Sequence, residues 1–186
     1  MDLETSLNTK ENVTYCYYYT DKFGKEIVSF RSNIEVVMSE MLGNHYFLAR
    51  KYLLATKELE EALKKQPQNK AIRRKLVICN AQCGELDRAL ELFISLIEED
   101  IEFITESDPL FDDCPCPELV YDLESQIDSY KNLATSNLKL GIFWLYCDIS
   151  KSIHYFNEYK KIKPDNPLVT KVLSILNSYL VTRDMI

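Results

Sequence analysis

Apolar and polar residues follow two different spacings along the chain. Residues 13–20 and 26–31 are rich in aromatic and β-branched side chains, and the stretch between them contains Gly24, a pattern typical of a β-hairpin. From Asn33 onward, apolar residues recur at steps of three and four, as in amphipathic helices. The residues that this spacing assigns to buried helix faces include Val36, Val37, Met41, Leu48, Leu53, Leu59, Ala62 and Leu63. The pattern therefore predicts an N-terminal arm followed by a helical body.

Polar residues and prolines mark where these helices begin and end. Residues 66–69 contain Pro67 and end one helix, and Asn69 is suited to cap the next. Gly84 lies at a short turn, and Asp165 and Asn166 precede Pro167 at the start of a last apolar helix. The sequence thus predicts pairs of helices joined by short turns, which is a reason to look for internal repeats.

Three segments of the chain resemble the tetratricopeptide repeat family, whose repeats are about 34 residues long. Residues 36–69 match it at Leu42, Gly43, Tyr46, Ala55, Leu59, Ala62 and Pro67. Residues 70–103 match it at Leu76, Gly84, Leu86, Ala89, Phe93 and Leu96. Residues 134–167 match it at Leu140, Gly141, Trp144, Ser152, Phe156, Tyr159 and Pro164, with an inter-helix turn one residue short. Ser39 and Arg50 depart from the pattern in the first repeat, and Val77, Asn80 and Ile101 depart from it in the second.

The resemblance implies an all-α fold, a TPR-like superhelix of antiparallel helix pairs with about three repeats and a capping helix over residues 168–181. A small N-terminal β-hairpin belongs to the arm, residues 1–33, and the TPR-like helical domain covers residues 34–186. Residues 104–133 are then an insertion, expected to be a loop followed by one extra helix opened by Pro117. Because the ends of helical stacks need a cover, the arm is expected to cover one end of the helical body. A hairpin is marginal alone, so it could also mediate a homodimer.

In this family, the first helix of each pair lines a concave groove that receives peptides or helical segments. The resemblance places nine candidate partner-binding residues in that groove: Glu40, Asn44, Phe47, Arg74, Ile78, Gln82, Leu138, Ile142 and Tyr146. Family members that grip the C-terminal carboxylate of heat-shock chaperones use a Lys where this chain has Glu40, although Asn44 matches. A mixed groove with apolar patches suits an amphipathic or extended protein segment better than a carboxylate.

Charge is concentrated in one part of the chain. The formal net charge is −7, yet residues 98–128 contain twelve Asp and Glu and no Lys or Arg, so the rest of the chain carries +5. The acidic segment either keeps an exposed region solvated or docks a basic patch of a partner. An acidic protein is a poor candidate for binding nucleic acid, and no apolar run is long enough to cross a membrane.

The insertion also contains Cys114 and Cys116, which are weak candidates for a metal site or a redox pair. Zinc sites usually place two residues between paired cysteines, whereas here there is one and no second pair follows closely. Six cysteines in 186 residues are typical of reduced thiols in a cytoplasmic protein. The more ordinary interpretation is a rigid turn whose thiols pack as small apolar groups.

No catalytic motif is present: the chain lacks a glycine-rich phosphate loop, a nucleophile elbow and a zinc-protease helix. The sequence therefore predicts a non-enzymatic protein-interaction module with no cofactor and a protein or peptide partner. Two alternatives stay open, a TPR-type chaperone for bacterial secretion substrates and a thiol or metal protein that uses Cys114 and Cys116.

Overall fold

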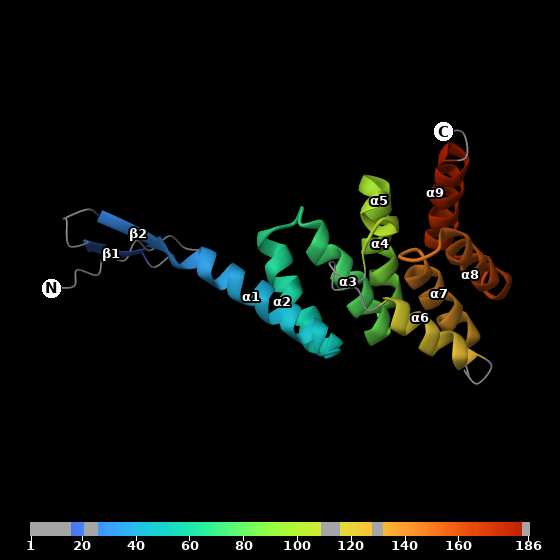
Figure 1. Cartoon of the computed structure of the whole chain (residues 1–186), viewed down its shortest axis with the longest axis horizontal. Coiled ribbons are helices and arrows are strands. Elements are labelled where there is room, and N and C mark those ends of the chain that lie inside the picture. Colours follow the sequence, from blue (N-terminus) through green and yellow to red (C-terminus); the bar gives the residue numbers. More distant parts are fainter. Residues whose placement is uncertain (1–15, 21–25, 109–115, 128–131, 184–186) are drawn as a thin grey trace.

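The structure is a computed structural model of the 186-residue chain. It describes residues 16–20, 26–108, 116–127 and 132–183, and it describes side chains from Met38 onward except Cys116 and Pro117. Helices make up the body of the molecule, with β1 and β2 at one end and α9 at the other (Figure 1).

Two short strands precede the helices. Strand β1 (Cys16–Thr20) pairs antiparallel with β2 (Glu26–Phe30), so that Cys16 lies opposite Phe30 and Thr20 opposite Glu26. The connection over residues 21–25 lies outside the described residues, and the N-terminal hairpin therefore stays a prediction. Strand β2 runs directly into α1, and both strands lie apart from the helical body (Figure 1).

The helices form three antiparallel pairs, which confirms the prediction of TPR-like helical repeats. The pairs are α1 (Arg31–Leu48) with α2 (Tyr52–Lys65), α3 (Lys70–Cys83) with α4 (Leu86–Asp100), and α7 (Leu133–Trp144) with α8 (Ile149–Ile162). Between the second and third pairs lie α5 (Glu102–Thr105) and α6 (Cys116–Ser125), and α9 (Pro167–Arg183) follows the third pair.

Side-chain caps and one glycine set several of these helix ends. Asn69 accepts a hydrogen bond from the backbone N–H of Ile72 (3.1 Å), and Asp148 accepts one from the N–H of Lys151 (3.0 Å). Such caps satisfy N–H groups that have no partner inside the helix. Gly84 ends α3 with φ of 89°, a left-handed conformation that glycine adopts without strain.

Two glycines allow the helices of a pair to approach closely. A Cβ atom built on Gly43 of α1 would lie 2.8 Å from the Leu59 side chain of α2. One built on Gly141 of α7 would lie 2.9 Å from the Phe156 ring of α8. The first and third pairs therefore share the same crossing, at the positions that the repeat pattern aligns.

The pairs then pack into one hydrophobic core. Helix α2 packs on α3, α6 packs on α7, and α9 packs on both α8 and α4. The contact between α9 and α4 includes an ion pair between Lys171 and Glu98 (2.7 Å). The last helix therefore folds back along the second pair as well as covering the third.

Three apolar residues that the helical spacing assigns to buried faces are exposed instead: Met41, Leu48 and Leu53. All three belong to the first helix pair, and among the described residues no helix precedes that pair. Amphipathic spacing identifies the apolar face of a helix, but it does not say whether another element covers that face. No helix among the described residues is long and apolar enough to cross a membrane.

Candidate partner-binding surface

The structure separates the nine predicted groove residues into two groups. Three of them, Glu40, Asn44 and Gln82, are half-buried. The other six are buried: Phe47, Arg74, Ile78, Leu138, Ile142 and Tyr146. The side chains of these six residues pack into the interior and present little surface to a partner in this structure. Whether any of the nine binds a partner stays a prediction.

Arg74 shows how the insertion closes part of the predicted groove. Its Nη1 donates a hydrogen bond to the backbone carbonyl of Phe103 (3.2 Å), and its guanidinium lies 4.7 Å from the centre of the Phe103 ring. Phe103 belongs to α5, directly after the second repeat. A buried cation stacked on an aromatic ring holds α5 in place and is not available to an acidic ligand.

Asn44 is also engaged within the chain. Its Oδ1 accepts a hydrogen bond from Lys75 Nζ (2.8 Å), which links α1 to α3, and the same ammonium lies 5.8 Å from the centre of the Phe47 ring. The Asn44 side chain is thus oriented by a neighbouring repeat.

Helix α6 of the insertion contacts both the first and the third helix pairs. At its start, Glu118 Oε2 lies 2.6 Å from Nη2 of Arg50, in the turn between α1 and α2. Near its end, Glu124 Oε1 accepts hydrogen bonds from Trp144 Nε1 (2.9 Å) and Tyr155 Oη (2.7 Å). Burial and the adjacent Glu124 carboxylate raise the pKa of Tyr155 to about 12. The acidic segment is therefore built into the repeat body by its carboxylates.

The cysteines give no support to a thiol or metal site in the described part of the chain. Cys114 lies outside the described residues, and nothing is described of the Cys116 side chain at the start of α6. Burial raises the pKa of Cys79 to about 12, which disfavours the reactive thiolate. Within the described residues, no group of three or more His, Cys, Asp or Glu side chains could hold a metal ion.

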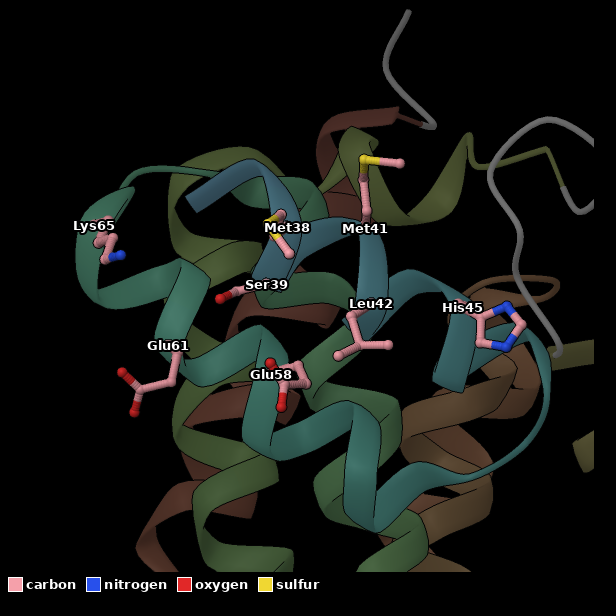
Figure 2. Close-up of a pocket in the computed structure, with 8 residues that line it drawn as sticks. All are labelled: Met38, Ser39, Met41, Leu42, His45, Glu58, Glu61 and Lys65. Atoms are coloured by element: carbon pink, nitrogen blue, oxygen red, sulfur yellow. The ribbon is translucent and has the colours of Figure 1, made fainter. Parts of the chain in front are cut away.

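An open apolar groove lies elsewhere, between α1 and α2. Figure 2 shows the side chains that line it: Met38, Ser39, Met41, Leu42 and His45 from α1, and Glu58, Glu61 and Lys65 from α2. The groove has a volume of about 720 Å³. We call it the α1/α2 groove.

The floor of the α1/α2 groove is apolar and exposed. Met38 is 63% exposed, Met41 is 66% exposed and Leu42 is 40% exposed. One departure from the repeat pattern in the sequence coincides with this surface. Met38 and Met41 flank Ser39, where the family pattern places a large residue, and all three precede the first glycine crossing.

The α2 wall of the groove is acidic at its centre. A hydrogen bond and the charge of Lys64 hold the pKa of Glu61 below its usual range, so Glu61 is ionised and paired. Among the described residues, the Glu58 side chain has no hydrogen-bond or ion-pair partner. The α1/α2 groove therefore offers an apolar floor and one unpaired carboxylate.

Comparison with known protein families finds a match over the central part of the chain. Residues 46–100, which run from the last turn of α1 to the end of α4, match the family model of the tetratricopeptide repeat. The search of curated proteins finds no match. The resemblance predicted from the sequence is thus confirmed for residues 46–100, which are similar to the tetratricopeptide repeat.

Proposed function

We propose that this chain is a protein-interaction module that binds a helical segment of a partner protein in the α1/α2 groove. The tetratricopeptide repeats support a role in protein–protein interaction in general. The observation that carries the specific site is the exposure of Met38, Met41 and Leu42 along a groove in the first helix pair.

The chemistry of the floor favours a helical partner. Methionine is flexible and polarizable, so it adapts to different apolar surfaces. Fully burying a Met or Leu side chain contributes about 1.5–3 kcal/mol relative to leaving it exposed. Three such side chains along one helix face can receive the apolar stripe of an amphipathic helix, a common mode of peptide recognition.

The concave surface offers fewer exposed residues for partner binding than the sequence alone indicates. All five apolar side chains predicted for it are buried, and Phe103 of α5 stacks on Arg74. Glu40, Asn44 and Gln82 are still half-exposed. A partner that used this surface would contact mainly polar groups, and such contacts contribute less to binding than apolar burial does.

The test is affinity capture from the source cells on three immobilised proteins. These are the wild type, Leu42→Glu in the floor of the α1/α2 groove, and Leu53→Glu on the outside of α2. Leu53 is 75% exposed and does not line the groove, so it is a matched control for adding one charge to an exposed leucine. We expect the partners captured by the wild type to be retained by Leu53→Glu and lost by Leu42→Glu. Equal capture by all three proteins would remove the α1/α2 groove as the binding site.

A further inference from the structure

The first and third helix pairs can be compared position by position because the same glycine crossing recurs, and the repeat spacing places the second pair in the same register. Gly43 meets Leu59 in the first pair, and Gly141 meets Phe156 in the third. Leu42 and Leu140 therefore occupy equivalent positions, each directly before the crossing glycine. Leu76 occupies this position in the second repeat.

Burial at these equivalent positions differs sharply between the pairs. Leu42 is 40% exposed, whereas Leu76 and Leu140 are at most 1% exposed. The same holds one turn earlier on the helix, where Met38 is exposed and its equivalents Ile72 and Ser136 are buried. The α1/α2 groove is thus the uncovered form of a face that is covered in the other two pairs.

The covers of the other two faces are helices. Helix α2 packs on α3, and its Glu60 forms an ion pair with Arg88 of α4 (2.7 Å). Helix α6 packs on α7, and Tyr121 of α6 contacts the Trp144 ring edge to face. The covering helices thus combine apolar packing with a charged group at the rim. In the α1/α2 groove the equivalent positions are exposed, and no helix among the described residues covers them.

The charge at the rim of the groove indicates which charge a helix bound there would carry. In the third pair, Tyr155 directly precedes the crossing residue Phe156 and donates a hydrogen bond to the acidic Glu124 of α6. In the first pair the equivalent residue, directly before Leu59, is the carboxylate Glu58, which has no partner among the described residues. Where the third pair accommodates an acidic helix, the first pair therefore attracts a basic one.

We infer that the α1/α2 groove accepts an amphipathic helix of a partner protein, whose apolar stripe lies on Met38, Met41 and Leu42 and carries a Lys or Arg beside it, opposite Glu58. This rests on the proposed function and specifies the chemistry of the partner. A second copy of the chain fits less well. Helix α1, which a two-fold contact would bring into the groove, has no Lys or Arg from Met38 to Leu48.

The test uses two synthetic helical peptides and the full chain. Both peptides are about 16 residues long, which gives about 24 Å of helix. They share one stripe of leucines on an alanine background, and they differ only in the residues beside the stripe, which are Lys in the basic peptide and Glu in the acidic one. Fluorescence anisotropy measures the Kd of each peptide. We expect the basic peptide to bind more tightly by up to about fivefold, the upper effect of one partly exposed ion pair.

Charge reversal at the rim identifies the residue responsible. We expect Glu58→Lys to reverse the preference between the two peptides. Glu91→Lys, on the exposed face of α4 and outside the groove, changes the net charge equally and should preserve the preference. Leu42→Glu should weaken the binding of both peptides, and Met41→Glu gives the same test at a more exposed position. Circular dichroism verifies that each variant is folded.

The possible results separate this inference from the proposed function. If both peptides bind equally and Glu58→Lys changes neither Kd, the inference about charge is wrong. If Leu42→Glu nevertheless abolishes the binding of both peptides, the groove is still supported as a binding site. If neither peptide binds the wild type, the inference fails, and the capture experiment judges the proposed function independently. A wild-type dimer that Leu42→Glu converts to a monomer would overturn the inference in favour of a second copy.

Discussion

Gly43 holds the first helix pair together because nothing larger fits between α1 and Leu59. A Cβ at this position would lie 2.8 Å from Cγ and Cδ2 of the buried Leu59 side chain. We expect Gly43→Ala to lower the free energy of unfolding by up to about 2 kcal/mol, since an overpacking cost of about 1–3 kcal/mol outweighs the gain of about 1 kcal/mol in helix propensity. Urea denaturation measures this change.

The background variant Leu59→Ala tests that cause. It removes the side chain that the new methyl group would meet, so Gly43→Ala made in that background should no longer destabilise the protein. The same penalty in both backgrounds would show that the close crossing is not the reason for the glycine.

Arg50 adopts a conformation that suits glycine. Its φ is 58°, it occupies the turn that corresponds to Gly84 in the second repeat, and its guanidinium pairs with Glu118 of α6. Both partners are substantially exposed, so we expect Glu118→Gln to cost less than about 1 kcal/mol. Arg50→Gly, made in the Glu118→Gln background, should raise the free energy of unfolding by about 0.5–1 kcal/mol, because glycine relieves the left-handed strain. A destabilised double variant, measured by urea denaturation, would show that Arg50 has another structural role.

At the scale of elements, the join between α3, α4 and α5 depends on ionised carboxylates. Lys70 Nζ donates a hydrogen bond to Asp100 (2.9 Å) and, with the backbone N–H of Phe103, holds the pKa of Asp100 below its usual range. A hydrogen bond and the charge of Arg73 likewise lower the pKa of Glu99.

A group whose pKa is lower in the folded state stabilises the fold above its unfolded pKa, about 4 for a carboxylic acid. That contribution is lost as the pH falls below about 4 and through the folded pKa. We expect Asp100→Asn to be less stable than the wild type at neutral pH, and the difference to shrink in acid. Urea midpoints measured from pH 7 downward test this, and a constant difference at every pH would contradict it.

The attachment of α6 to the third pair has a spectroscopic signature. Tyr155 has a pKa of about 12 because of burial and, secondarily, its hydrogen bond to Glu124. Glu124→Gln removes the negative charge but not the burial, so we expect the pKa of Tyr155 to fall while staying above the ordinary value of about 10. An NMR titration with ring-labelled tyrosine measures this. An unchanged pKa would mean that Glu124 does not contact the phenol in solution.

The sequence predicts the helices well because their boundaries depend on local chemistry. Asn69 caps α3 as predicted, and Gly84 forms the turn that its position in the repeat indicates. The sequence does not predict where α6 packs. A loop followed by an amphipathic helix contains no local signal for the repeat that the helix will contact. The Glu124 hydrogen bonds to Trp144 and Tyr155 join side chains 20 and 31 residues apart in the chain.

At the scale of the whole molecule, the sequence does not predict the candidate site, because exposure depends on packing between helix pairs. The repeat pattern treats Leu42, Leu76 and Leu140 as the same position, yet Leu42 is 40% exposed whereas Leu76 and Leu140 are buried. Arg74 and Ile78 fit the concave surface by position, but tertiary packing buries both. Repeat position predicts how a residue packs within its pair, whereas exposure depends on what precedes and follows the pair.

The central claim is that a partner covers the floor of the α1/α2 groove. The most direct measurement is hydroxyl-radical footprinting of Met38 and Met41, alone and with the partner captured on the wild-type chain. Methionine oxidation reports on access to the side chain, and Leu53, exposed and outside the groove, is an internal control. We predict that the partner strongly reduces oxidation of both methionines and leaves Leu53 unchanged. Unchanged oxidation of Met38 and Met41 in a complex that is demonstrably formed would contradict the claim.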